Sequence, residues 1–309
     1  MAHFATFDSL AVALLACAFW LAVRSGQRRA LILDAALAST AAVMVMVKYA
    51  SLPFVLPVLA VVAVVAVPAV GWRWAVARGL VTAGLVAAFI AGCVLLSGPD
   101  LMKGVTSTTL ARSSDQVAAS VILRHSVAYI GGIVTVAAIG MIALSVKGDG
   151  AMRGTFAQRT VLGFVLIGAA LIAPVASLRL HTLTSLEKHA GYGLIFATPV
   201  VGFLLARIGV RSFLRNGVAV AVAGSLGFVG FAKARRFFTE WPDSTALVQA
   251  LSPLVTSPAT RILAEENSVP RYYLAGSIRQ SQWSDTYYLA YTPAAAEAGS
   301  PGCRPTARP

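Results

Sequence analysis

The chain has 309 residues, of which 58% are hydrophobic and 12% are charged, and its formal net charge is +13. One soluble core cannot bury that much apolar surface, and the apolar residues come in long blocks. The sequence therefore predicts an all-α polytopic membrane protein and excludes an ordinary soluble domain. Its basic residues stand singly or in small groups between the apolar blocks, which indicates topology signals and contacts with membrane lipids, and no nucleic-acid partner.

Cysteine usage predicts neither a disulfide framework nor a metal site. Cys17 and Cys93 lie inside apolar blocks, Cys303 lies near the end of the chain, and no CxxC motif or Cys/His cluster occurs. We predict no cofactor, and the sequence gives no support for a divalent metal.

About eight transmembrane helices are predicted from the apolar blocks, several of them short for a hydrocarbon core about 30 Å thick. The predicted spans are Phe7–Val23, Ala30–Val47, Ala50–Val70, Leu80–Leu96, Ser126–Val146, Thr160–Ala176, Gly191–Ala206 and Gly217–Ala232.

Basic residues are unequally divided between the two sets of connections. Four short connections hold eleven of them, and the alternate connections hold six. Because cytoplasmic loops carry the excess of Lys and Arg, we place the first set in the cytoplasm and both chain ends outside. The basic residues of the first set are Arg24, Arg28, Arg29, Arg73, Arg78, Lys147, Arg153, Arg159, Arg207, Arg211 and Arg215.

The outer connection Ser177–Tyr192, SLRLHTLTSLEKHAGY, is the first candidate site, because it packs ionisable residues between two apolar runs. A charge at the bilayer centre costs roughly 3 kcal/mol, so these side chains are expected at an interface or in a wet cavity. An ordinary polar loop is the alternative. The ionisable residues are Arg179, His181, Glu187, Lys188 and His189.

Two further outer segments carry candidates. Lys48, beside Tyr49 in a tight connection, either extends its ammonium to the lipid headgroups or holds a lipid phosphate as a compact point charge. In the long outer loop, TSTTLARSSD offers hydroxyl groups and the Arg112 guanidinium to phosphate or sugar oxygens, although such a segment is also typical of a solvated loop. Asp34 is predicted to be an interhelical or interfacial partner.

The composition changes after the eighth span. We predict a transmembrane domain over residues 1–232, a small extracytoplasmic α/β module over residues 233–293 and a disordered tail over residues 294–309. In the module, Ser244–Leu251 has a helical pattern, and Thr260–Ala264, Arg271–Ala275 and Thr286–Tyr291 have β-type composition. Its aromatic residues either stack on sugars or fill the module core; they are Tyr272, Tyr273, Trp283, Tyr287, Tyr288 and Tyr291.

Common soluble-enzyme motifs are missing: the sequence has no Walker loop, GxGxxG, GxSxG or HExxH. Secondary transport loses support because Asp34 is the only carboxylate expected within the membrane, Asp8 being at the mouth of the first span, and because no paired broken helices or inverted repeat are evident.

Several segments, in order, resemble the later part of bacterial GT-C glycosyltransferases, in the branch of protein O-mannosyltransferases and lipid A aminoarabinose transferases. They run from about Phe4 to Tyr291: FATFDSLAVALLACAFWLAVRSGQRR, VMVKYASLPFVLPVLA, KGVTSTTLARSSD, RLHTLTSLEKHAGYGLIFATPVVGFLLA, WPDSTALVQAL and ATRILAEENSVPRYYLAG. The resemblance implies transfer of a sugar from a polyprenyl-phosphate donor to a lipid, protein or polysaccharide acceptor at the outer face of the cell membrane.

The resemblance also implies roles for single residues. Lys48 and Tyr49 look like a Lys-containing turn near the donor, and Lys188 with His189 looks like a basic pair beside it. We expect Lys48, Arg112, Lys188 and His189 to line a phosphate pocket, while a carboxylate near the acceptor hydroxyl acts as general base. Asp8 and Glu187 are the acidic candidates.

One part of the family pattern has no counterpart here. Those enzymes carry their catalytic acidic residue on a first outer loop between two earlier spans, and no Asp or Glu of this chain matches it. We therefore expect a fragment-like member that is truncated at its N-terminus and truncated or frame-shifted at its C-terminus. The alternatives are a non-catalytic subunit that binds a lipid phosphate and a transporter for polyprenyl lipids.

Overall fold

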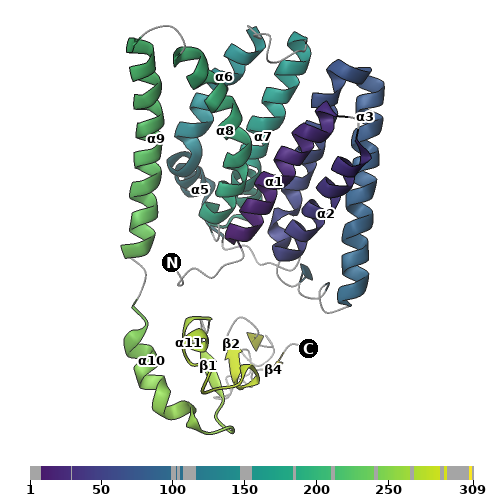
Figure 1. Cartoon of the computed structure of the whole chain (residues 1–309). Coiled ribbons are helices and arrows are strands. Elements are labelled where there is room, and N and C mark those ends of the chain that lie inside the picture. The colour runs from purple at the N-terminus through teal and green to yellow at the C-terminus, as the bar shows by residue number, and fades with distance from the viewer. Residues whose placement is uncertain are drawn as a thin grey trace. The chain divides into compact units, whose positions relative to one another are not determined.

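A computed structural model gives the arrangement of the chain in two compact units, Met1–Val229 and Gly230–Pro309 (Figure 1). It describes residues 8–28, 30–98, 102, 105–106, 116–146, 155–183, 186–209, 213–239, 243–264, 268–285, 289–290 and 306–307.

The first unit is a bundle of long apolar helices. Within the described residues, six helical segments are long and apolar enough to cross a membrane, which supports the predicted polytopic membrane protein. The elements of this unit are α1 (Asp8–Gln27), α2 (Leu31–Val47), η2 (Tyr49–Phe54), α3 (Val55–Ser97), α5 (Ala119–Ser126), η4 (Val127–Gly131), α6 (Gly132–Val146), α7 (Phe156–Leu180), α8 (Leu186–Gly209) and α9 (Phe213–Thr239), the last of which continues past Val229.

The long helix α3 is two antiparallel arms joined at Gly71. This glycine has φ 75° and ψ 165°, a conformation open almost only to glycine, and the chain reverses there. The arms then pack closely, because a Cβ placed on Gly79 would lie 3.2 Å from the Cβ of Ala63. The predicted span Leu80–Leu96 falls on the second arm, and Ala50–Val70 covers part of η2 and the first arm.

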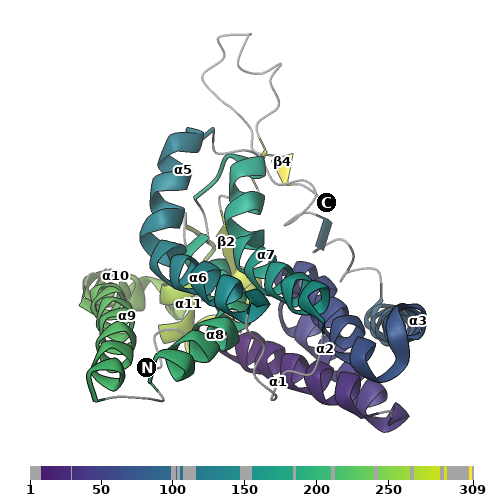
Figure 2. The ribbon, with the colours of Figure 1, turned by 90° about the horizontal axis from the view of Figure 1, so that it is seen from above.

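Helices α1, α2 and α3 form one group, and α6, α7 and α8 form a second group beside it (Figure 2). Ala11, Leu15, Ala18 and Ala22 recur at helical spacing along α1 and are fully buried. The three alanines are small enough to let the helix backbones approach closely, which favours helix association in a membrane. The two groups meet where α1 contacts α8 and α3 contacts α7.

Close backbone contact also joins α7 to α8. A Cβ on Gly193 would lie 2.8 Å from the Cα of Ala170 and 2.9 Å from the Ala169 carbonyl oxygen. Helix α7 has defined ends: Thr155 and Gln158 form a capping box at its start, and His181 ends it in the left-handed conformation.

The second unit contains α10 (Thr245–Leu251), η5 (Ser252–Thr256), β1 (Ile262–Ala264), α11 (Ser268–Tyr273), η6 (Gln280–Gln282), β2 (Trp283–Asp285), β3 (Leu289–Ala290) and β4 (Thr306–Ala307). Strands β1 and β2 are parallel, with Ile262 opposite Trp283, and β3 and β4 are antiparallel. The helical prediction for Ser244–Leu251 is confirmed by α10. Thr306 and Ala307 lie in the tail predicted to be disordered, and most of that tail is outside the described residues.

The predicted strand Arg271–Ala275 is wrong, because α11 and a turn occupy these positions. Tyr272 and Tyr273 favour a strand by composition. Leu274 and Ile278, however, are four residues apart and are both buried against Val255 and Trp283, so local helical and turn structure places the two side chains in the core.

Candidate functional site

The ion pair between Asp8 and Lys48 is the centre of the candidate site. Asp8 is the first residue of α1, and Lys48 lies in the break between α2 and η2. The Lys48 Nζ is 3.0 Å from the Asp8 Oδ1, and the two side chains are 28% and 13% exposed. Two residues predicted separately, one as a phosphate ligand and one as an acidic candidate, are thus direct partners.

The Lys48 backbone is held on both sides of that break. Its N–H donates to the Met44 carbonyl oxygen at 3.0 Å, and its carbonyl oxygen accepts the Ser51 N–H at 2.9 Å. The helix cannot continue here because Lys48 is extended, with φ −153° and ψ 100°. The main chain is therefore positioned, and the flexible four-carbon stem sets where the ammonium lies.

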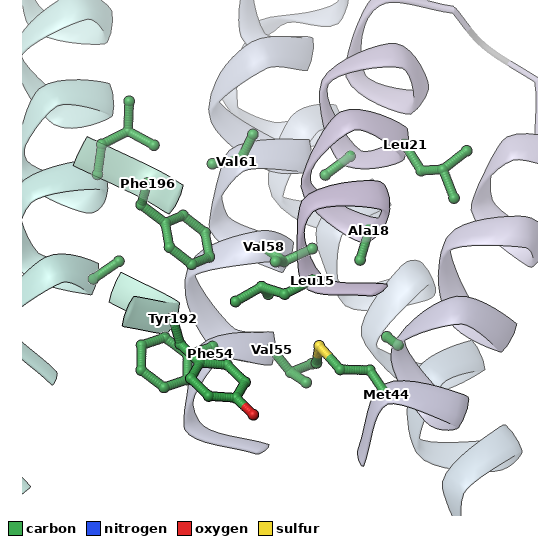
Figure 3. Packing of buried hydrophobic residues seen from close by; sticks show 14 of the residues in the cluster. Leu15, Ala18, Leu21, Met44, Phe54, Val55, Val58, Val61, Tyr192 and Phe196 are labelled. Carbon is green, nitrogen blue, oxygen red and sulfur yellow. The ribbon is translucent and has the colours of Figure 1, made fainter. Parts of the chain in front are cut away.

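Tyr192 of α8 binds the same carboxylate oxygen. Its hydroxyl donates to the Asp8 Oδ1 at 3.2 Å, and Tyr192 itself is fully buried. Its ring stacks on Phe54 with the centroids 5.5 Å apart, in a core that includes Phe196 (Figure 3). The Tyr192 ring is thereby fixed by packing, and its hydroxyl is held at Asp8.

The basic pair of the outer connection lies at the same end of the bundle. Lys188 is in the first turn of α8 and is exposed, and the ring of His189 lies 6.2 Å from that of Tyr192. Tyr49 begins η2 and is 37% exposed. The N-terminus of α1, the C-terminus of α2 and the N-terminus of α8 all lie at this end, so Lys48 and Lys188 are not on opposite faces (Figure 1). Arg112 is outside the described residues.

Glu187 takes part in a different contact. The Tyr129 hydroxyl donates to the Glu187 Oε1, and Tyr129 lies in η4, a turn of π-helix between α5 and α6. A π-helical turn shifts the following side chains relative to those of a regular α-helix. The ring of His125 lies 6.2 Å from that of Tyr129. Glu187 therefore connects α8 to η4, while Asp8 carries the contact with a basic candidate.

His181 connects two segments that are far apart in the sequence. The Val117 N–H donates to the His181 carbonyl oxygen at 2.9 Å, and the His181 Nδ1 lies 3.3 Å from the Val117 carbonyl oxygen. This double contact joins the residues before α5 to the end of α7, so the long outer connection and the segment after α7 meet at the same end of the bundle.

Asp34 lies at the opposite end and is an interhelical partner, as predicted. Its Oδ2 accepts from the Arg78 Nη2 at 3.1 Å, and its Oδ1 accepts from the Ser25 hydroxyl. The same Arg78 nitrogen lies 3.1 Å from the Arg28 carbonyl oxygen. This buried cluster joins α1, α2 and the second arm of α3, and within the described residues the buried Arg78 Nε is left without a hydrogen-bond partner.

Tyr192 and Tyr129 are the residues that the sequence did not single out. Tyr192 was the last residue of the candidate stretch, but it begins an apolar run and has the pattern of a core residue. Its position four residues after Lys188 is the available signal, because residues four apart lie on one face of a helix. Among the described residues, no three His, Cys, Asp or Glu side chains come together as a metal site.

Comparisons with protein-family models, curated proteins and solved structures found no match to this chain.

Proposed function

We propose that the chain is a membrane glycosyltransferase of the GT-C type, with a polyprenyl-phosphate-linked sugar as donor and a lipid, protein or polysaccharide as acceptor. The proposed site is the end of the bundle that carries Asp8 and Lys48. The positive-inside rule places this end on the outer face of the cell membrane. The sequence resemblance supplies the reaction class.

The Asp8–Lys48 ion pair is the observation that carries the proposal. A carboxylate and an ammonium lie 3.0 Å apart and partly exposed at the termini of two apolar helices. Charged groups in membrane proteins are costly and usually serve ligands or proton transfer. A cation beside a carboxylate also matches the two requirements of sugar transfer from a phosphate, namely charge neutralisation of the leaving group and a base for the acceptor.

Each group then has one role in the reaction. The acceptor hydroxyl loses its proton to the Asp8 carboxylate, and its oxygen forms a bond to the anomeric carbon of the sugar. The bond from that carbon to the phosphate oxygen breaks, and the electron pair remains on the phosphate. Lys48, with Lys188 on the same end, neutralises the departing phosphate, and His189 next to Lys188 offers a ring N–H to its oxygens.

The test is a transfer assay with the full chain in lipid nanodiscs. The donors are radiolabelled polyprenyl-phosphate mannose and polyprenyl-phosphate aminoarabinose, and the measurement is release of polyprenyl phosphate together with transfer of label. We expect turnover that Asp8→Asn and Lys48→Met each reduce by at least about a hundredfold, which is within the usual contribution of acid–base groups. Arg179→Met is the control, because Arg179 is an exposed cation in the last turn of α7.

Other outcomes contradict the proposal in distinct ways. Donor binding without turnover identifies a non-catalytic lipid-phosphate-binding subunit. Movement of the intact donor across a vesicle bilayer without sugar release identifies a transporter. Equal loss of activity in Arg179→Met and Lys48→Met removes Lys48 from its assigned role.

A further inference from the structure

We infer that the Asp8–Lys48 ion pair is the ligand-free state of the phosphate site, in which the lipid phosphate replaces Asp8 as the partner of Lys48 and Tyr192 holds Asp8 in place during the exchange. The inference rests on the proposed function for its ligand. It adds Tyr192 as a positioning residue. It also sets the order of two events, with phosphate binding by Lys48 coming before proton transfer to Asp8.

Geometry identifies Lys48 as the partner that moves. Its side chain is 28% exposed, and only its main chain is fixed, by Met44 and Ser51. Asp8 is 13% exposed, and its short side chain begins a helix. The lysine side chain has a four-carbon stem and the aspartate side chain has a one-carbon stem. Moving the ammonium outward toward an approaching anion therefore costs less free energy than moving the carboxylate.

Tyr192 is the reason that Asp8 stays. Its hydroxyl and the Lys48 ammonium both bind the Asp8 Oδ1, at 3.2 Å and 3.0 Å. The phenol is fully buried and stacked on Phe54, so its hydroxyl does not follow a ligand. When Lys48 leaves, the Tyr192 hydroxyl still orients the carboxylate, which is released from its cationic partner and can take the proton of the acceptor hydroxyl. Phosphate binding and base activation are thereby coupled.

The exchange makes Asp8 a competitor of the phosphate. In the free protein the Asp8 carboxylate is paired with Lys48, the cation that the phosphate needs. In the complex the Asp8 carboxylate and the phosphate are two anions that lie close together. Removing the Asp8 charge is therefore expected to tighten phosphate binding while it abolishes transfer. A role for Asp8 in binding the phosphate, directly or through a bridging metal, gives the opposite sign.

The experiment measures binding of a short-chain polyprenyl phosphate without a sugar to the full chain in nanodiscs. Asp8→Asn is expected to bind about three- to tenfold more tightly than the unmodified chain, and Lys48→Met at least about tenfold more weakly, since a charge-assisted hydrogen bond is lost. In the Lys48→Met background, adding Asp8→Asn is expected to change the affinity less than it does alone, because the cation for which the two anions compete is gone.

Tyr192→Phe separates positioning from binding. It is expected to leave the polyprenyl phosphate affinity within about twofold and to lower kcat without raising the donor KM, because its hydroxyl contacts Asp8 and not the ligand. Tyr129→Phe is the matched control: it removes a phenol hydroxyl that binds Glu187 at the same end, and it is expected to change neither value.

Two results would overturn the inference. One is weaker phosphate binding in Asp8→Asn and also in Asp8→Ser, a second uncharged polar variant in case the asparagine variant does not fold. The other is a loss of phosphate affinity in Tyr192→Phe equal to that in Lys48→Met. Because the ligand carries no sugar, failure of the transferase proposal appears as missing turnover with this binding pattern intact, and failure of the inference appears in the binding pattern itself.

Discussion

Asp34 of α2 and Arg78 of the second arm of α3 form a buried salt bridge, with the Arg78 Nη2 3.1 Å from the Asp34 Oδ2, at the end of the bundle opposite Asp8 and Lys48. Both ends of the first helix group therefore carry one carboxylate paired with one cation. Asp34 is only 3% exposed and is surrounded by protein donors, whereas the Asp8–Lys48 pair has a partly exposed cation. The first pair suits structural support, and the second is accessible to a ligand.

Removing one partner of the buried pair is expected to destabilise the bundle. Asp34→Ala removes the carboxylate that pairs with the Arg78 guanidinium and accepts from the Ser25 hydroxyl, which costs about 3 kcal/mol. Thermal unfolding in detergent measures the effect. The double variant Asp34→Ala/Arg78→Ala is expected to be more stable than Asp34→Ala alone, because no unpaired charge remains buried. If the double variant is the less stable of the two, the pair is not a coupled unit.

Gly71→Ala is expected to destabilise the reversal between the two arms of α3. An alanine at φ 75° and ψ 165° meets a steric penalty of about 1–3 kcal/mol. The control is Gly84→Ala in the second arm, where a Cβ meets nothing within 4 Å and helix propensity improves. A lower unfolding temperature only for Gly71→Ala is the expected result. Equal effects of the two substitutions would show that the arms do not need a glycine at the turn.

Gly193→Ala is expected to push α7 and α8 apart. The added methyl would meet backbone atoms of Ala169 and Ala170, which cannot rotate away, so overpacking costs about 1–3 kcal/mol. Gly191→Ala, two residues earlier in the same helix, adds a methyl in open space and serves as the control. Detergent thermal unfolding compares the two. A stable Gly193→Ala variant would contradict the close approach of these helices.

The predicted orientation is testable by cysteine labelling in intact cells. In a chain with Cys17, Cys93 and Cys303 replaced, a membrane-impermeant maleimide is expected to label Ser97→Cys at the Lys48 end without permeabilisation. Gln27→Cys, at the Arg24 end, is expected to react only after the membrane is opened. Both positions are exposed in the structure. The reverse pattern would place Asp8 and Lys48 in the cytoplasm and contradict the proposed outer-face site.

The apolar blocks predicted the helices well, because the length and composition of a span follow directly from the thickness and polarity of the bilayer. The orientation inferred from the charge distribution stays a prediction, whereas the partner expected for Asp34 is present in Arg78. In the second unit, composition misassigned Arg271–Ala275, since burial of Leu274 and Ile278 against Trp283 outweighed the strand preference of two tyrosines.

The site could be predicted only as a set of residues at one end. Which cation faces which carboxylate depends on how each helix is rotated about its axis, and the packing of small residues such as Gly193 decides that rotation. Asp8 and Lys48 are far apart in sequence, and Glu187, next to Lys188, faces Tyr129 instead. Tyr192 was missed because a buried tyrosine in an apolar helix has the same pattern as any other core aromatic residue.

The stack of Tyr192 on Phe54 limits the route by which a ligand could arrive. This stack lies where the two helix groups meet, which is where a rocking transporter would have to open. Tyr192, Phe54 and Phe196 are buried there, and the hydrogen bond from Tyr192 to Asp8 adds a polar contact between the groups. A molecule with a long isoprenoid tail would reach this end sideways, with its tail remaining in the surrounding bilayer and only its phosphate and sugar in contact with the protein. A carrier would need a long channel through the protein. A headgroup that contacts the reactive groups of the protein at the membrane surface needs no such channel.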